Sequence, residues 1–182
     1  PLQQNKEIKE LAIEMESGNV SAVIQIDCNP VYHFSKDTGY AEALKKVAFS
    51  VAISDVENET TAASQLVLPV HHALESWGDY YTRSGLYSLQ QPLLSPLYKT
   101  RQKEGIMLSL LAGVVYQENA YRENIKVYAK KEIYDKMGLL VSFDNFWKAA
   151  LQCGFVKMAT PAFEARKISF EAVKEISAGN GH

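Results

Sequence analysis

The residues best suited to hold a ligand follow two apolar runs of the sequence. Asp27-Cys28-Asn29-Pro30 comes directly after the β-rich run 20–26, and the polar residues 55–61 come directly after the apolar run 49–54. If both runs are parallel strands of an open sheet, their carboxyl ends meet at one edge, which is where such sheets bind ligands. Five residues could then line one crevice: Asn29, Pro30, Asp55, Glu59 and Thr60.

The same residues also have a purely structural interpretation. Asn-Pro breaks a strand, and Asn58 or Glu59 can start a helical turn. The chain contains neither a G-x-G-x-x-G sequence nor a Walker sequence, so no mononucleotide motif decides between the two interpretations.

His71, His72 and Glu75 combine imidazole and carboxylate groups, which suit zinc or iron. However, Pro69 precedes them, no further strong ligand is evident, and H-E-x-x-H and its inverse are both absent. Local hydrogen bonds that hold the surrounding segment are the favoured interpretation. We predict no metal-ligating residues.

The two cysteines, Cys28 and Cys153, are too few for a disulfide framework, a four-cysteine zinc site or an iron–sulfur cluster. Neither has a neighbouring cysteine or a histidine placed by a motif, so both are expected to be inert thiols. No Ser/His/Asp signature can be placed either. We therefore predict no catalytic residues in this chain.

The segment 70–101 is rich in aromatic residues, glycine, proline and glutamine and has little periodicity. We expect an irregular arm here, because long irregular segments in compact domains pack as arms or carry function. Trp77, Tyr80, Tyr81 and Tyr87 could stack a ring-bearing ligand, but an arm without regular structure needs large side chains to pack. We expect these side chains to be buried against the sheet or against later helices.

The first 69 residues alternate between helical and strand-like patterns. Apolar spacing predicts a helix that includes Met15, with Gly18 as its C-cap, and another helix over 40–47. Strands are predicted at 20–26, 49–54 and 66–69. Alternating strands and helices indicate a parallel sheet covered on both faces. The predicted fold class is α/β, a three-layer αβα Rossmann-like domain with a mostly parallel sheet and extra C-terminal helices.

The remainder, 102–182, is predicted to be mainly helical. Ser142 is a plausible N-cap for one of its helices, and Gly154 ends that helix. Helices are expected over 106–116, 124–136, 143–151 and 170–176. We expect residues 1–182 to form a single α/β domain.

The composition excludes several classes of protein. With 47% hydrophobic and 22% charged residues, the 182-residue chain is of ordinary globular composition and can bury one core. The formal net charge of −2 and the absence of a basic stripe argue against nucleic acid as a partner. The apolar runs are far shorter than the ~20 residues of a membrane span. Because the chain begins at Pro1 without methionine, we expect a processed protein or a piece of a longer one.

Four strings occur in order along the first half of the chain. They are Asp27-Cys28-Asn29-Pro30, Asn58-Glu59-Thr60-Thr61-Ala62, Leu66-Val67-Leu68-Pro69 and Glu75-Ser76-Trp77-Gly78. This succession resembles the third domain of the molybdopterin oxidoreductases of the dimethyl sulfoxide reductase superfamily. In that family the domain is α/β and contacts one pterin guanine dinucleotide. The resemblance implies that Asn29, Asp55, Glu59 and Thr60 match positions that face the dinucleotide.

Longer strings are similar to one branch of this family. They are Asn29-Pro30-Val31-Tyr32-His33, His71-His72-Ala73-Leu74-Glu75-Ser76-Trp77-Gly78-Asp79 and Ser88-Leu89-Gln90-Gln91-Pro92. They look like the large molybdopterin-oxidoreductase-like subunit of bacterial alternative complex III, which is fused to an iron–sulfur half in a quinol-oxidising respiratory complex. The resemblance is dense over about half of the chain and loose over the helical remainder.

The chain departs from the family pattern in two respects. Asp27 stands where the family has glycine; glycine lets the backbone approach a phosphate, whereas a carboxylate repels it. The molybdenum-ligating residue and the cluster cysteines of the family are absent from this chain. The resemblance implies that this branch has lost the molybdenum cofactor from the subunit, and Asp27 agrees with that.

From the resemblance we expect a structural domain without catalysis of its own and without a cofactor in this chain, in a parent that carries iron–sulfur clusters. The expected partners are other domains of the parent subunit and other subunits of a membrane respiratory complex. The parent is expected to be bacterial, exported and attached to the periplasmic side of the membrane, without direct membrane insertion of this chain. Two alternatives stay open: a domain that binds molybdopterin guanine dinucleotide in an active molybdenum oxidoreductase, and a free-standing Rossmann-like enzyme.

Overall fold

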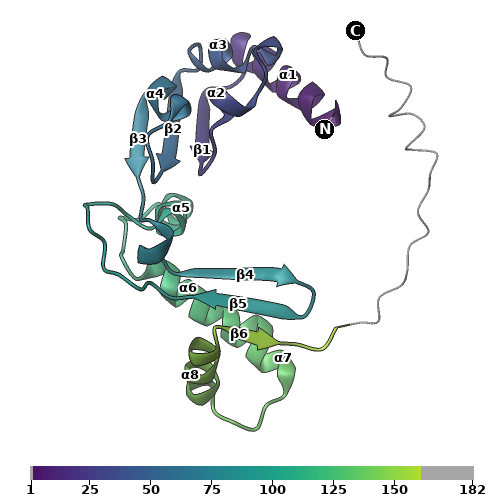
Figure 1. The fold of residues 1–182 in the computed structure, drawn as a ribbon, viewed down its shortest axis with the longest axis vertical. Coiled ribbons are helices and arrows are strands. Elements are labelled where there is room, and N and C mark those ends of the chain that lie inside the picture. The colour runs from purple at the N-terminus through teal and green to yellow at the C-terminus, as the bar shows by residue number, and fades with distance from the viewer. Residues whose placement is uncertain (1, 161–182) are drawn as a thin grey trace, which may run out of the picture.

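A computed structural model describes residues 2–160 of the chain (Figure 1). The helix predicted over 170–176 lies outside the described residues. Three parallel strands form the first sheet, in the order β1-β2-β3. They are β1 (Ala22–Ile26), β2 (Phe49–Ser54) and β3 (Leu66–Pro69). The predicted strands 49–54 and 66–69 have these bounds, and the α/β fold class is confirmed.

Short helical elements connect these strands. They are α2 (Pro30–His33), the 3-10 turn η1 (Lys36–Thr38), α3 (Tyr40–Leu44) and α4 (Glu59–Ala63). Before the sheet, α1 (Leu2–Glu16) is followed by Gly18, whose positive φ of 77° allows the helix to end there, as predicted.

Helices cover the two faces of the parallel sheet. On one face, α1 and α3 form a buried cluster that Val23 of β1 contacts. The cluster consists of Ala12, Met15, Tyr40, Ala43, Leu44 and Val47. On the other face, Ile106 of α5 (Lys103–Ala112) packs against Val51, Ile53 and Val70. The three layers of the predicted αβα domain are therefore present.

The prediction of an irregular arm over 70–101 is wrong for much of its length. After the 3-10 turn η2 (Ala73–Glu75), the strands β4 (Gly78–Arg83) and β5 (Leu86–Gln90) form an antiparallel hairpin. The strand β6 (Phe155–Lys157) pairs with β5 and completes a second sheet, β4-β5-β6. Because β4 is mostly polar and β6 is remote in the chain, no local apolar pattern marks this sheet.

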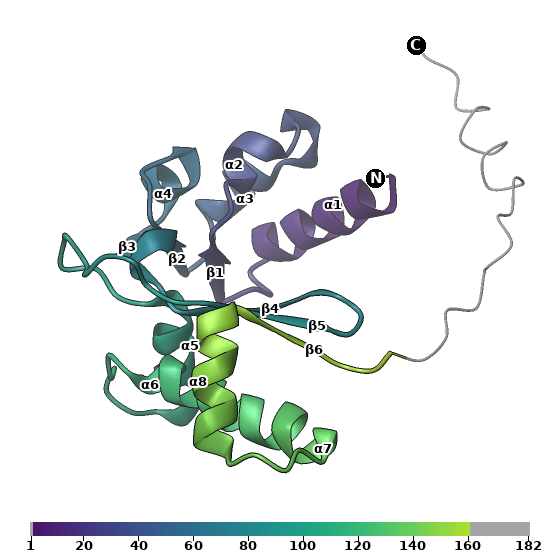
Figure 2. The same ribbon diagram turned by 60° about the horizontal axis from the view of Figure 1, so that its bottom comes forward.

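The later helices pack on the second sheet, and Figure 2 shows them gathered on one side of it. They are α6 (Ala120–Tyr128), a π-helical turn (Ala129–Tyr134), α7 (Asp135–Met137) and α8 (Phe143–Cys153). Tyr87 and Leu89 of β5 join Ile125, Ile133 and Trp147 in one core cluster. The Ser142 side chain accepts a hydrogen bond from the Asn145 N–H at 3.4 Å, and Gly154 ends α8 at a φ of 73°, as predicted.

Two sequence predictions need correction here. The helix predicted over 106–116 ends at Ala112, because Gly113 adopts the left-handed conformation with a φ of 64°. Of the aromatic side chains expected to be buried, Tyr87 is 1% exposed, but Tyr80 and Tyr81 are each 51% exposed and Trp77 is only partly buried. Strand alternation accounts for Tyr80, which pairs with Ser88 on the face opposite to Tyr87. Tyr81 pairs with Tyr87 and lies against its ring, with 5.2 Å between the ring centroids, but it stays half exposed.

None of the described helices combines the length and the apolar character that a membrane crossing requires.

Candidate functional site

The carboxyl ends of the three parallel strands lie along one edge of the first sheet, as the strand order requires. Asp27 follows β1 with a positive φ of 48°, a conformation uncommon for residues other than glycine. Asn29 then precedes α2, whose first residue is the buried Pro30. Proline suits this position, because its ring fixes a helical φ and the missing N–H would have no partner within the helix.

Three of the predicted site residues hydrogen-bond to one another. The Asn29 Oδ1 accepts hydrogen bonds from the Thr60 backbone N–H at 3.2 Å and from the Thr60 hydroxyl at 2.7 Å. The Asn29 Nδ2 donates to the Glu59 Oε2 at 2.6 Å. This hydrogen bond holds the pKa of Glu59 below its usual value, so the carboxylate is charged near neutral pH. The interactions tie the loop after β1 to the start of α4.

The surrounding residues reinforce this connection. Thr60 is fully buried, and its Oγ1 also accepts a hydrogen bond from the Val31 N–H at 3.1 Å. Asn58 is the N-cap of α4, since its Oδ1 accepts from the backbone N–H groups of Thr60 and Thr61, both at 3.0 Å. Sequence left open whether Asn58 or Glu59 starts this helical turn; Asn58 is the cap, Glu59 is the first helical residue, and the polar atoms of Asn29 and Thr60 bond within the protein.

Asp27 forms an ion pair with Lys103, the first residue of α5. Partial burial of Lys103 disfavours its charged form, but the hydrogen bond and the charge of Asp27 outweigh this effect and raise the pKa of Lys103. The pair joins the end of β1 to the helix on the other face of the sheet. Sequence reasoning missed Lys103, because no motif or spacing relates residues 76 positions apart.

Asp55 is separate from the Asn29 network within residues 2–160, where no hydrogen bond connects them. It lines a cavity of about 260 Å³ together with Asp27, His71, Lys103 and Glu104. Trp77, Tyr80 and Gln90 also line this cavity. The structure thus joins Asn29, Glu59 and Thr60 in one hydrogen-bonded group, places Asp55 in the wall of this cavity, and leaves Pro30 apart from both as the first residue of α2.

The histidines of the predicted local network make separate contacts. His71 is buried, with Nδ1 at 2.6 Å from the Thr100 Oγ1 and Nε2 at 3.1 Å from the Glu118 Oε1. His72 caps η2, because its Nδ1 accepts from the Leu74 N–H at 3.2 Å. The expected local hydrogen bonds are present, and in the described part of the chain no three His, Cys, Asp or Glu side chains gather in a way that could hold a metal ion.

Glu75 connects two turns of the segment that follows β3. One carboxylate oxygen accepts from the His72 N–H at 3.3 Å, and the other accepts from the Leu97 N–H at 3.0 Å. Both carboxylate oxygens of Glu75 therefore accept hydrogen bonds from backbone N–H groups.

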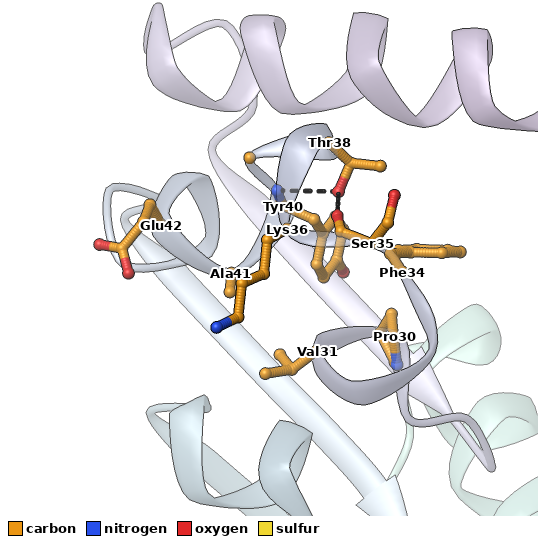
Figure 3. A pocket seen from close by; sticks show the side chains of 10 residues that line it. Pro30, Val31, Phe34, Ser35, Lys36, Thr38, Tyr40, Ala41 and Glu42 are labelled. Atoms are coloured by element: carbon orange, nitrogen blue, oxygen red, sulfur yellow. Dashed lines mark hydrogen bonds between the residues drawn. The ribbon is translucent and has the colours of Figure 1, made fainter. Parts of the chain in front are cut away.

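A second cavity, of about 490 Å³, lies beside Pro30 between α2, η1 and α3. Figure 3 shows Val31, Phe34 and Tyr40 around it, with Lys36 and Glu42 also on its lining. The Thr38 hydroxyl donates to the Ser35 carbonyl at 2.8 Å and accepts from the Tyr40 N–H at 3.4 Å, which fixes the η1 turn. The network of Asn29 lies outside this cavity, which shares only Pro30 with the predicted residues.

Comparisons with known proteins bear on this site. No protein-family model matches the chain. The chain is 32% identical over 93 residues to the menaquinone reductase, molybdopterin-binding-like subunit, of Nitratidesulfovibrio vulgaris; the match covers 49% of this chain and 14% of that protein. The fold is similar to acetylene hydratase from Pelobacter acetylenicus, with a TM-score of 0.52 and 16% identity over 59% of this chain and 16% of that one.

The sequence match shows that about half of the chain is similar to part of a molybdopterin-binding-like subunit. The structural similarity bears on the fold alone, and the chain spans only about one seventh of the relative's length. The activity and partners of the whole protein are therefore matters of proposal.

A molybdopterin oxidoreductase-type domain implies a pterin guanine dinucleotide at the strand ends. The residues present here do not fit that group. The cavity that Asp27 and Asp55 share, of about 260 Å³, is below the ~300–1,000 Å³ of pockets that enclose drug-sized ligands, and the wider hollows beside Asp55 and Glu59 have Lys99 as their one cationic residue. The lining of the smaller cavity places the carboxylates of Asp27, Asp55 and Glu104 beside a single ammonium group, that of Lys103, which Asp27 already neutralises. A pyrophosphate would meet net negative charge there.

Proposed function

We propose that the chain is a structural domain of a molybdopterin oxidoreductase-like subunit in a respiratory complex that exchanges electrons with a quinone. In this proposal the domain binds no pterin dinucleotide and catalyses no reaction itself. One observation carries the proposal: three of the strand-end residues that would face a dinucleotide, Asn29, Glu59 and Thr60, hydrogen-bond to one another, and Asp27 pairs with Lys103.

The respiratory setting rests on the relative, whose name joins menaquinone reduction with a molybdopterin-binding-like subunit. The motif resemblance implies the opposite direction, quinol oxidation, so the shared function is electron exchange with a quinone. We propose that the remaining domains of the parent carry iron–sulfur clusters. Other subunits of a bacterial membrane complex, on the periplasmic side, would be its partners.

The second candidate is a domain that binds the dinucleotide in an active molybdenum oxidoreductase. Its support is the location of the 260 Å³ cavity, at the strand edge where open α/β sheets bind ligands. In this case Asn29, Pro30, Asp55, Glu59 and Thr60 would act as binding residues, and their mutual hydrogen bonds would have to rearrange.

GDP can distinguish the two candidates, because it carries the guanosine and the pyrophosphate of the dinucleotide. Titration of the 182-residue chain with GDP, followed by calorimetry, is expected to give no binding up to millimolar concentration. Micromolar binding that Asn29→Ala abolishes would overturn the structural proposal. Since Asn29→Ala also alters folding contacts, Glu59→Gln provides a second variant, with circular dichroism to establish that each variant is folded.

A further inference from the structure

The outer edge of β3 has unpaired backbone groups at Val67. The Val70 N–H donates to the Ser54 carbonyl of β2 at 3.2 Å, so the backbone groups of Val67 and Pro69 point away from the sheet. Beyond Val67, this edge is already paired: Arg101 donates to the Pro69 carbonyl at 3.3 Å and accepts from the His71 N–H at 3.1 Å. Within residues 2–160, Val67 has no comparable outer partner.

Two hollows adjoin this edge and share the residues Glu57 and Val67. One, of about 560 Å³, separates β3 from the segment 98–100 that leads to Arg101. The other, of about 660 Å³, lies between Val67 and α4. We call the two hollows together the β3 groove. Each is large enough for several side chains of a peptide.

The β3 groove presents large apolar side chains to solvent. Val56 is 60% exposed, Val67 41% and Tyr98 75%. These three side chains line one hollow, and adjoining exposed apolar side chains are a common feature of protein–protein contact surfaces.

The charges of the groove favour a basic partner. Asp55, Glu57 and Glu59 line it, and Lys99 is its single cationic residue. Asn29 already binds Glu59, but Asp55 and Glu57 make no ion pair among the described residues.

We propose that the β3 groove binds an extended segment of a partner protein in which apolar residues alternate with basic ones. The segment pairs its backbone with the outer N–H and C=O of Val67, as in strand addition to an exposed sheet edge. Alternate side chains enter the hollows beside Val56 and Tyr98, and a basic side chain lies near Glu57. The groove includes Asp55 and Glu59 of the strand-end site, but its apolar side chains and the open edge at Val67 lie outside that site.

A peptide titration tests this inference. The probe is a capped pentapeptide of alternating valine and lysine, added to the isotope-labelled 182-residue chain, with amide chemical shifts measured by NMR. Shifts are expected at Val67 and at Val56 to Asn58. A matched peptide of valine and glutamate is expected to cause none.

Two variants probe the two parts of the interaction. Val67→Pro removes the outward N–H and is tolerated on an edge strand. It is expected to weaken binding about threefold to tenfold, the effect of one hydrogen bond. Glu57→Lys is expected to abolish binding, whereas Glu7→Lys, the same charge change on exposed α1, is expected to leave it unchanged.

If Val67→Pro fails to fold, Glu57→Lys still decides the matter. Shifts confined to other surfaces, equal binding of the glutamate peptide, or unchanged affinity of Glu57→Lys would each overturn the inference.

Discussion

The Asn29 side chain is hydrogen-bonded to both the backbone N–H and the hydroxyl of Thr60, a residue 31 positions later in the chain. This contact fastens the loop after β1 to the start of α4 at the edge where a ligand would enter. The motif resemblance assigns Asn29 and Thr60 to a cofactor, whereas in the structure they stabilise the edge of the sheet.

Replacement of Asn29 by alanine should destabilise the chain. The change leaves the hydroxyl of Thr60, which is fully buried, without its acceptor, and such a loss costs ~1–3 kcal/mol. Urea unfolding measures the free energy. Asn19→Ala is the control, because Asn19 is exposed and its side chain hydrogen-bonds, among the described residues, to Glu14 alone; it should change stability by less than about 0.5 kcal/mol. Equal effects of the two variants would contradict a structural role for Asn29.

The ion pair between Asp27 and Lys103 should contribute weakly and in a salt-dependent way. Asparagine also tolerates the positive φ at this position, so Asp27→Asn removes the charge with little added backbone strain. Because both side chains are about one-third exposed, we expect a loss of no more than ~1 kcal/mol. At low salt the Asp27→Asn variant should have a lower free energy of unfolding than the unaltered chain. At ~1 M salt this difference should disappear, because salt screens the charges. A difference that persists at high salt would assign the effect to backbone geometry instead.

The buried tyrosines should make stability fall in alkaline solution. Burial, together with a hydrogen bond to the Asp79 carboxylate, raises the pKa of Tyr87 and of Tyr121 well above the usual range. An unfolded tyrosine loses its proton near pH ~10, so the stabilisation is complete below pH ~10 and is lost as the pH rises above it. The free energy of unfolding between pH 8 and 11 or so, measured in urea, should decline above ~10.

The double variant with Tyr87→Phe and Tyr121→Phe should show a smaller decline over the same pH range, even though it starts from lower stability. Tyr32→Phe is a suitable control, because Tyr32 is 68% exposed. A pH profile of the double variant parallel to that of the unaltered chain would exclude these two tyrosines as the cause.

Trp77 should contribute less than a fully buried tryptophan. It is partly buried against the core cluster that contains Tyr87 and Trp147, and the Arg122 guanidinium lies 5.3 Å from the centre of its ring. A fully buried aromatic side chain costs ~3–5 kcal/mol on truncation to alanine, so Trp77→Ala should cost roughly half of that. Denaturant unfolding of this variant checks the value. Tyr87→Ala should lower the free energy of unfolding clearly more than Trp77→Ala, because Tyr87 is 1% exposed. A larger loss for Trp77→Ala would contradict this prediction.

Much of the first sheet could be predicted from the sequence. Apolar runs mark β1, β2 and β3, turn-forming residues follow β1 and β2, and Pro69 is the last residue of β3; these signals act within a few residues of the chain. The same local chemistry predicted Ser142 and Gly154 as the limits of α8, and a helical turn that starts at Asn58 or Glu59. The interpretation of Asn29, Glu59 and Thr60 as turn and cap residues was likewise available from sequence.

Only the tertiary structure decided what these residues contact. The pairing of Asp27 with Lys103 depends on α5 crossing the far face of the sheet, and the second sheet depends on β6 returning to β5. Both require contacts between segments far apart in the chain, which residue spacing does not encode. The sequence by itself determined the strands of the first sheet and the limits of α8, since periodicity and turn chemistry are local. The packing of remote elements decided that β4, β5 and β6 form a second sheet and that Asn29, Glu59 and Thr60 bond to one another.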